Sequence, residues 1–138
     1  MLVQIAQMLE EQPFNEKAKD FRAWAITYVI QTDAVSVVVC AGKIVEPLLD
    51  KKNKYGSELT GQYTIGMAAF KLKNPDKADD ENAAQLAGLE SAIKAYQAMV
   101  KEKPKAQFVG MDDFAAKLQS GELKKMVDEA DCGKGKKQ

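Results

Sequence analysis

The chain has 138 residues and a mass of 15.2 kDa, which fits one domain whose core needs no metal or disulfide. Its 20 Lys and Arg residues balance its 20 Asp and Glu residues, so the net charge is zero and a strongly basic nucleic-acid-binding protein is not expected. The absence of histidine excludes imidazole bases, histidine-activated nucleophiles and histidine-ligated metal sites within this chain.

Two amphipathic helices are expected at the N-terminus. The first covers Leu2–Glu11 and ends before Pro13, because a residue that precedes proline avoids the helical region. The second covers residues 15–31, and Asn15 is suited to cap its first turn. Its apolar residues recur at helical spacing, at Phe21, Trp24, Ala25, Tyr28 and Val29.

The next segment is rich in valine, and two secondary structures are open for it. Apolar residues recur at helical spacing through residues 34–49, and Asp33 offers a cap, so a helix is the preferred prediction. The β-branched residues 35–40 also suit a strand, and a small β-meander over residues 26–45 is the alternative. Pro47 has no backbone N–H, so the helix is expected to kink or end near Val45.

The second half of the chain predicts four more helices. A helix over residues 57–73 is followed by a stop at Asn74 and Pro75, and a long helix covers residues 82–103. A short helix opens at Asp112 or Asp113, and the last one follows Ser120. The expected fold is therefore all-α, with six or seven helices in stacked antiparallel hairpins or an irregular bundle. Residues 1–131 are expected to form one domain, and residues 132–138 a disordered tail rich in Lys and Gly.

One segment, from Tyr63 to Pro104, resembles the helical hairpin of tetratricopeptide repeats. The residues that carry the resemblance are Ile65, Gly66, Ala92, Tyr96, Met99 and Pro104, with Tyr63 and Phe70 as nearby aromatic residues. Met99 departs from the small residue that the family prefers, and the linker between the two helices is longer than the family's turn. The resemblance implies that Gly66 packs closely against Ala92, with Gly88 in a similar role, and that the hairpin belongs to a binding scaffold.

The chain has two cysteines, Cys40 and Cys132. Cys40 lies in an apolar run and is expected to be a small buried residue, whereas Cys132 is expected to be exposed. A disulfide between them would suit an exported protein, and the pairing stays open at this point. No transmembrane run and no signal peptide are visible, and the compartment stays open: cytoplasmic, or exported if a signal peptide has been removed.

The sequence contains none of the motifs that would indicate catalysis or cofactor binding. No phosphate-binding loop, nucleophile elbow or EF-hand is present, and we expect no cofactor and no metal. The expected function is therefore a non-enzymatic protein or peptide interaction module; the alternatives are a self-assembling homodimer and, third, an enzyme without histidine. A partner groove is predicted at the aromatic residues Trp24, Tyr28, Tyr63, Phe70 and Tyr96.

Overall fold

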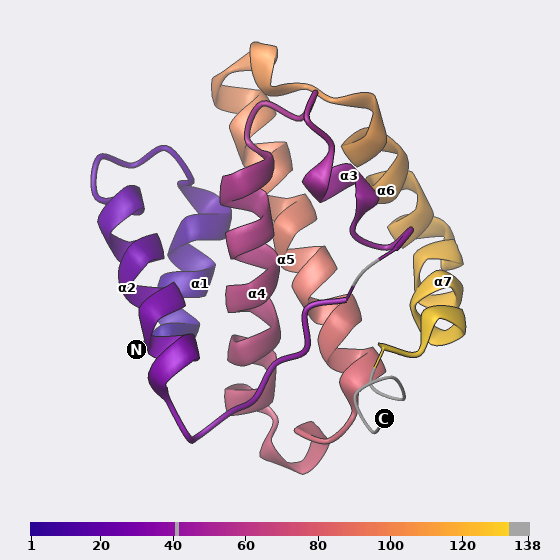
Figure 1. Cartoon of the computed structure of the whole chain (residues 1–138). Helices are drawn as coiled ribbons and strands as arrows, with labels where there is room; N and C mark the ends of the chain where they lie inside the picture. Colours follow the sequence, from indigo (N-terminus) through magenta and orange to yellow (C-terminus); the bar gives the residue numbers. More distant parts are fainter. Residues whose placement is uncertain (41, 133–138) are drawn as a thin grey trace.

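The computed structural model describes residues 1–40 and 42–132, and within these residues the chain is helical and has no β-strand (Figure 1). Seven α-helices and two 3-10 helices follow in the order α1 (Leu2–Glu11), α2 (Ala18–Gln31), α3 (Glu46–Leu49), α4 (Gly56–Lys73), η1 (Pro75–Lys77), α5 (Glu81–Glu102), η2 (Pro104–Ala106), α6 (Val109–Ser120) and α7 (Glu122–Ala130). The predicted all-α class and number of helices are confirmed.

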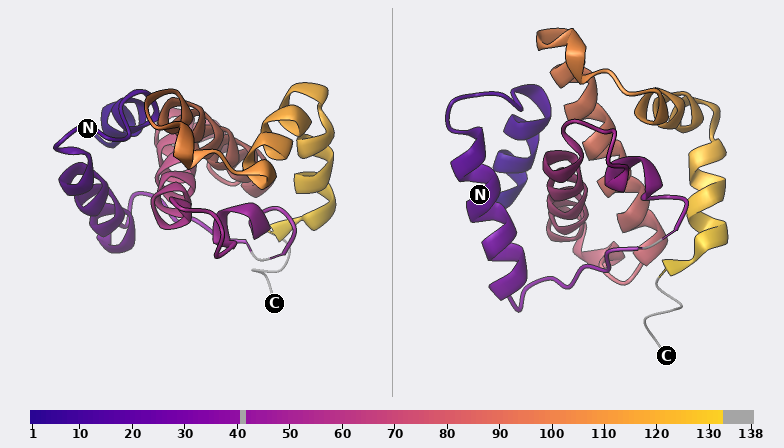
Figure 2. Two further views of the ribbon diagram at one scale, coloured as in Figure 1. Left: turned by 90° about the horizontal axis from the view of Figure 1, so that it is seen from above. Right: turned by 45° about the horizontal axis from the view of Figure 1, so that its top comes forward.

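Helices α4 and α5 form a long antiparallel hairpin at the centre of the molecule. Helices α1 and α2 pack on one side of this hairpin, and α6 and α7 pack on the other (Figures 1 and 2). One apolar cluster joins α1 and α2 to Ile65, Ala68 and Ala69 of α4, and a second joins Tyr63 and Met67 of α4 to α3, α5, α6 and α7. Helix α4 therefore serves two cores at once and is buried on opposite faces.

Local signals place several of the helix ends. The Asp80 carboxylate accepts a hydrogen bond from the Ala83 N–H at 3.0 Å and caps the start of α5. Helix α4 ends at Lys73, before the predicted Asn74 and Pro75 stop. Gly121 separates α6 from α7 with a φ of 85°, a conformation that glycine adopts without steric strain. Helix α6 begins at Val109, one turn before the predicted start at Asp112 or Asp113.

The prediction of a helix over residues 34–49 was wrong. Residues 32–40 and 42–45, called the strap below, form neither a helix nor a strand; α3 begins at Glu46 and is only four residues long. Pro47 stands in the first turn of α3, where the missing N–H has no partner in any helix, so it starts a helix instead of ending one. The run of β-branched valines disfavours a helix here, and Gly42, with a φ of 95°, turns the chain between the strap and α3.

Three side chains of the central hairpin hold the strap by its backbone. The Lys71 ammonium donates to the Ser36 carbonyl at 2.5 Å, and the Gln85 amide donates to the Val38 carbonyl. The Cys40 N–H donates to the Tyr63 hydroxyl at 3.2 Å. These hydrogen bonds take the place of the backbone hydrogen bonds that a helix or a sheet would have supplied, because backbone polar groups near a core require partners.

The two cysteines are paired in a disulfide. Their Cα atoms are 5.7 Å apart, and the bond joins the strap to Cys132, two residues after the end of α7, across 92 positions of sequence. Both cysteines are half-buried, so the expectations of a buried free thiol at Cys40 and an exposed Cys132 were wrong. Of the predicted tail at residues 132–138, Cys132 is fixed by this bond, and residues 133–138 lie outside the described residues.

Candidate functional site

The five aromatic residues predicted to form a partner groove lie in three different places. Tyr63 and Tyr96 are buried in the core between α4 and α5. Phe70 is half-buried near the C-terminal end of α4, where it lines a groove. Trp24 is exposed on α2, and Tyr28, whose ring stacks on it, is half-buried against the apolar cluster of α1 and α2. The sequence-based grouping therefore combines two core residues with residues of two separate surfaces.

The two buried tyrosines act as structural cross-links. The Tyr63 hydroxyl donates to the Gln85 side-chain carbonyl and accepts from the strap, and burial raises the pKa of Tyr63. The Tyr96 hydroxyl accepts from the Phe108 N–H at 2.7 Å and contacts the Asp112 carboxylate at 2.7 Å. Burial, with a smaller contribution from the nearby Asp112, raises the pKa of Tyr96 to about 12. Neither phenol faces a space that a partner could enter.

The outer side of α2 carries an exposed aromatic surface. Trp24 is 42% exposed and its ring stacks on Tyr28, with ring centroids 5.4 Å apart and an interplanar angle of 15°. Phe21, one turn before Trp24, is 37% exposed. The aromatic face of α2 is defined here as Phe21, Trp24 and Tyr28. The predicted buried stripe of this helix also contained Ala25 and Val29, and these two are buried together with Ala18, whereas Phe21 and Trp24 are exposed and Tyr28 is half-buried.

An apolar hollow adjoins the aromatic face. Its volume is about 510 Å³, and it is lined by Met1, Gln4, Ile5, Met8 and Phe21. The sequence did not identify Met1, which is exposed, or Met8, which is half-buried, as surface residues, because helical spacing alone does not show which apolar residues stay in contact with solvent. Together with the face of α2, the hollow extends an apolar surface from the start of α1 to the second half of α2.

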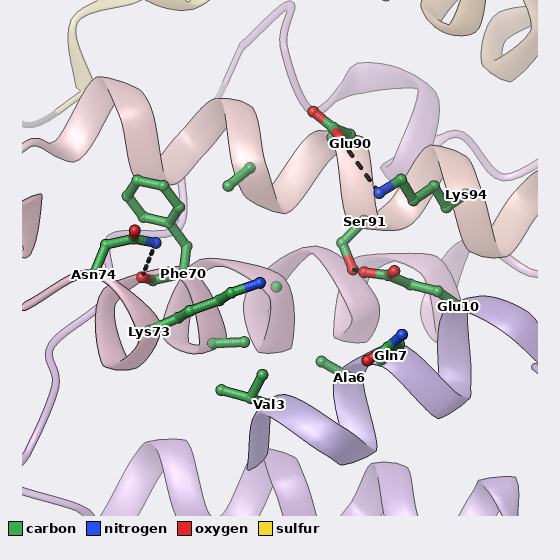
Figure 3. A pocket seen from close by; sticks show the side chains of 13 residues that line it. Val3, Ala6, Gln7, Glu10, Phe70, Lys73, Asn74, Glu90, Ser91 and Lys94 are labelled. Carbon is green, nitrogen blue, oxygen red and sulfur yellow. Dashed lines mark hydrogen bonds and ion pairs between the residues drawn. The ribbon is translucent and has the colours of Figure 1, made fainter.

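A groove lies between α1 and the α4–α5 hairpin (Figure 3). Its volume is about 520 Å³. Each of the three helices contributes residues at the spacing of one helix face. The lining residues are Val3, Ala6, Gln7 and Glu10 from α1; Gly66, Ala69, Phe70, Lys73 and Asn74 from α4 and its end; and Ala87, Glu90, Ser91 and Lys94 from α5. The groove is therefore lined by both small and charged side chains.

The charged and polar groups of this groove are largely paired with one another. The buried Gln62 donates to the Ser91 hydroxyl at 2.9 Å, and Ser91 in turn donates to Glu10 at 2.6 Å. Glu90 and Lys94 form an ion pair at 3.4 Å on the rim (Figure 3). Because each of these charges already has a partner, the groove offers a ligand few unpaired groups and one large apolar contact, Phe70.

The α4–α5 crossing shows the close approach that the repeat-like segment predicts, but with different partners. A Cβ atom on Gly66 would lie 2.6 Å from the Ser91 Cβ and 3.2 Å from the Gly88 Cα. Gly66 therefore faces Gly88 and Ser91, one position before the expected Ala92. Gly88 has the predicted role, since a Cβ atom there would lie 2.6 Å from the Tyr63 carbonyl oxygen.

The described residues contain no group of three or more His, Cys, Asp or Glu side chains that could hold a metal ion. No helix among them is long and apolar enough to span a bilayer. Asp112 and Asp113, the predicted start of a helix, have local partners: Asp112 contacts Tyr96, and Asp113 pairs with Lys117 at 3.0 Å.

No protein-family model matches this sequence, and no curated protein or solved structure shows a significant similarity to it. The tetratricopeptide-like reading of the central hairpin therefore stays a prediction.

Proposed function

We propose that this chain is a non-enzymatic protein-interaction module that binds its partner through the aromatic face of α2. The observation that carries the proposal is the stacked pair of Trp24, which is exposed, and Tyr28, on α2, an outer helix of the molecule (Figure 2). Trp and Tyr are enriched among the residues that contribute most to protein–protein binding. Soluble proteins also rarely expose contiguous apolar surface without a binding role.

The aromatic face is favoured over the groove between α1, α4 and α5 on energetic grounds. A partner that covers Phe21, Trp24 and the half-buried Tyr28 removes the exposed parts of these rings from water, at about 25 cal/mol for each Å² of apolar area. The stacked rings are held in place before binding, which lowers the entropy that association costs. The groove would require a partner to displace the paired Glu10 and Glu90 from their present contacts.

The partner surface is expected to be apolar and to insert at least one large side chain beside Phe21. The hollow at Met1, Ile5 and Met8 supplies the receiving volume, and methionine side chains adapt their shape to what they contact. An amphipathic helix has the apolar stripe that such a surface accepts.

The Cys40–Cys132 disulfide supports an oxidising compartment as the place where the module works, because structural disulfides seldom persist against cytosolic thiols. Non-reducing peptide mapping of the protein purified from its native cells tests this point. A free thiol at both cysteines in freshly alkylated cells would contradict it.

The test of the binding surface compares two variants of the same helix. Trp24→Ala combined with Tyr28→Ala removes the aromatic pair, and Ile30→Ala removes an equally apolar side chain that is exposed elsewhere on α2. Proteins captured from native extract are quantified by mass spectrometry for wild type and both variants. We expect a specific set that wild type and Ile30→Ala retain and that the double variant loses at least tenfold. Identical capture by all three proteins, at equal thermal stability, would refute the proposal.

A further inference from the structure

Within the strap, residues 36–40 form an extended chain. Its anchors Tyr63 and Lys71 stand eight positions apart on α4, which separates them by about 12 Å along the helix. They hold Cys40 and Ser36, which stand four positions apart. Four residues span about 13 Å when extended and about 6 Å when helical. Only an extended backbone therefore matches the spacing of the anchors.

The anchored backbone groups all lie on one edge of the strap. The carbonyls of Ser36 and Val38 and the N–H of Cys40 point to the side chains of α4 and α5. In an extended chain, backbone groups of successive residues point to opposite edges. The groups of Val35, Val37 and Val39 consequently belong to the other edge. Within the described part of the chain, no hydrogen bond reaches the backbone N–H or C=O of these three valines.

The second edge has the properties of an open strand edge. The strap crosses the front of α4 and α5, and no helix lies over it (Figure 1). Val39 is 57% exposed, so an apolar β-branched side chain already faces water beside the unpaired groups. Unpaired backbone groups on a β-prone segment are a template for pairing with another extended chain.

We propose that this edge pairs with the same edge of a second copy of the chain, in antiparallel orientation, about a twofold axis near Val37. Val35 then pairs with Val39 of the other copy, and the two Val37 residues pair with each other. Three residues with one donor and one acceptor each supply about six main-chain hydrogen bonds to the ribbon. The same surface is used by both copies, as a twofold contact requires.

The charged residues that flank the three valines favour pairing with a second copy of the chain in the antiparallel direction. Asp33 precedes the valines and Lys43 follows them, and both are exposed. Antiparallel pairing brings Asp33 of one copy and Lys43 of the other to the same end of the ribbon, whereas parallel pairing would place like charges together. The chain carries no net charge, so two copies do not repel each other at long range. This contact does not use the aromatic face of α2, so each proposal can fail alone.

The test uses the full-length, disulfide-bonded protein and two substitutions at one position. Val39→Pro removes the backbone N–H at position 39 and keeps the extended φ of the strap, and Val39→Ala removes most of the side chain and keeps the N–H. Sedimentation equilibrium from micromolar to millimolar concentration measures the dimer dissociation constant. We expect a concentration-dependent dimer in wild type, weakened at least tenfold by Val39→Pro and less than about threefold by Val39→Ala. Trp24→Ala should leave the dimer unchanged.

Hydrogen exchange on the wild-type protein provides a second readout if Val39→Pro does not fold. The amides of Val35, Val37 and Val39 should exchange more slowly as the protein concentration rises, and the Cys40 amide, already bonded to Tyr63, should not change. A monomer at all concentrations, equal weakening by both substitutions, loss of the dimer in Trp24→Ala, or concentration-independent exchange of the three valine amides would overturn the proposal.

Discussion

Two glycines of α4 show how strongly the surroundings of a single residue decide its role. A Cβ atom on Gly66 would collide with Ser91 of α5 at 2.6 Å. A Cβ atom on Gly61 would lie 3.6 Å from its nearest neighbour, the Arg22 side chain, which is an ordinary contact. Glycine is therefore required at Gly66 by the packing of two helices, whereas at Gly61 it only weakens the helix.

The matched substitutions Gly66→Ala and Gly61→Ala should change stability in opposite directions. We expect Gly66→Ala to lower the free energy of unfolding by about 1–3 kcal/mol, because α4 and α5 must move apart to admit the methyl group. Gly61→Ala should raise it by about 0.5–1 kcal/mol, because alanine loses less entropy in a helix. Urea unfolding followed by circular dichroism measures both changes, and a stabilising effect of Gly66→Ala would contradict the close crossing.

At the scale of elements, the strap is the part of the fold that depends most on side chains from elsewhere. The Lys71 side chain is 3% exposed and bridges the Ser36 carbonyl and the Glu81 carboxylate, the latter at 2.5 Å. Lys71 thereby ties the strap, α4 and the start of α5 at one point. A lysine is seldom this buried unless it is paired, and here both of its partners are fixed.

Lys71→Met should detach the strap, and Lys73→Met on the same helix is the control because Lys73 is exposed. We expect Lys71→Met to lower the free energy of unfolding by about 2–4 kcal/mol, since it leaves a carbonyl and a carboxylate without their partner. Amide exchange over residues 34–40 should accelerate in this variant and stay at wild-type rates in Lys73→Met. Unchanged exchange in both variants would show that Gln85 and Tyr63 suffice to hold the strap.

At the scale of the whole molecule, the disulfide connects the strap to the C-terminal end of α7, and both of these belong to the apolar cluster shared by α3 to α7. The strap runs from the α1–α2 side of α4 toward the α7 side (Figure 2), where Cys40 is bonded to Cys132 beyond the end of α7. The bond closes a loop that contains α3 to α7, so it restricts the unfolded chain over most of its length. The α1–α2 side, with its aromatic face, stands outside this loop.

Reduction should therefore lower global stability while the fold persists. We expect a loss of about 2–5 kcal/mol in the free energy of unfolding, from a loop of this length. Guanidinium unfolding with and without dithiothreitol measures the loss. A variant with Cys40→Ala and Cys132→Ala should resemble the reduced protein and should not respond to dithiothreitol. Complete unfolding on reduction at 25 °C would show that the helical core alone is insufficient.

The sequence by itself determined the parts of this protein that depend on neighbouring residues. Helical periodicity and the stop at Asn74 and Pro75 are local, because helix hydrogen bonds join residues four positions apart. From these signals the all-α class, the number of helices and the long central hairpin followed. The sequence also predicted the close approach of the two helices at Gly66, although it named Ala92 as the partner in place of the neighbouring Ser91.

Only the tertiary structure decided the strap, the disulfide and the exposed surface. The strap's hydrogen-bond partners Tyr63, Lys71 and Gln85 lie 23 to 47 positions away, so no local pattern could reveal that the valine-rich residues 35–40 form no helix. Periodicity also cannot choose between two adjacent apolar stripes of one helix. In α2, packing on α1 and α4 buries the Ala25 side and leaves the Trp24 side in solvent, and this choice sets the surface to which we assign binding.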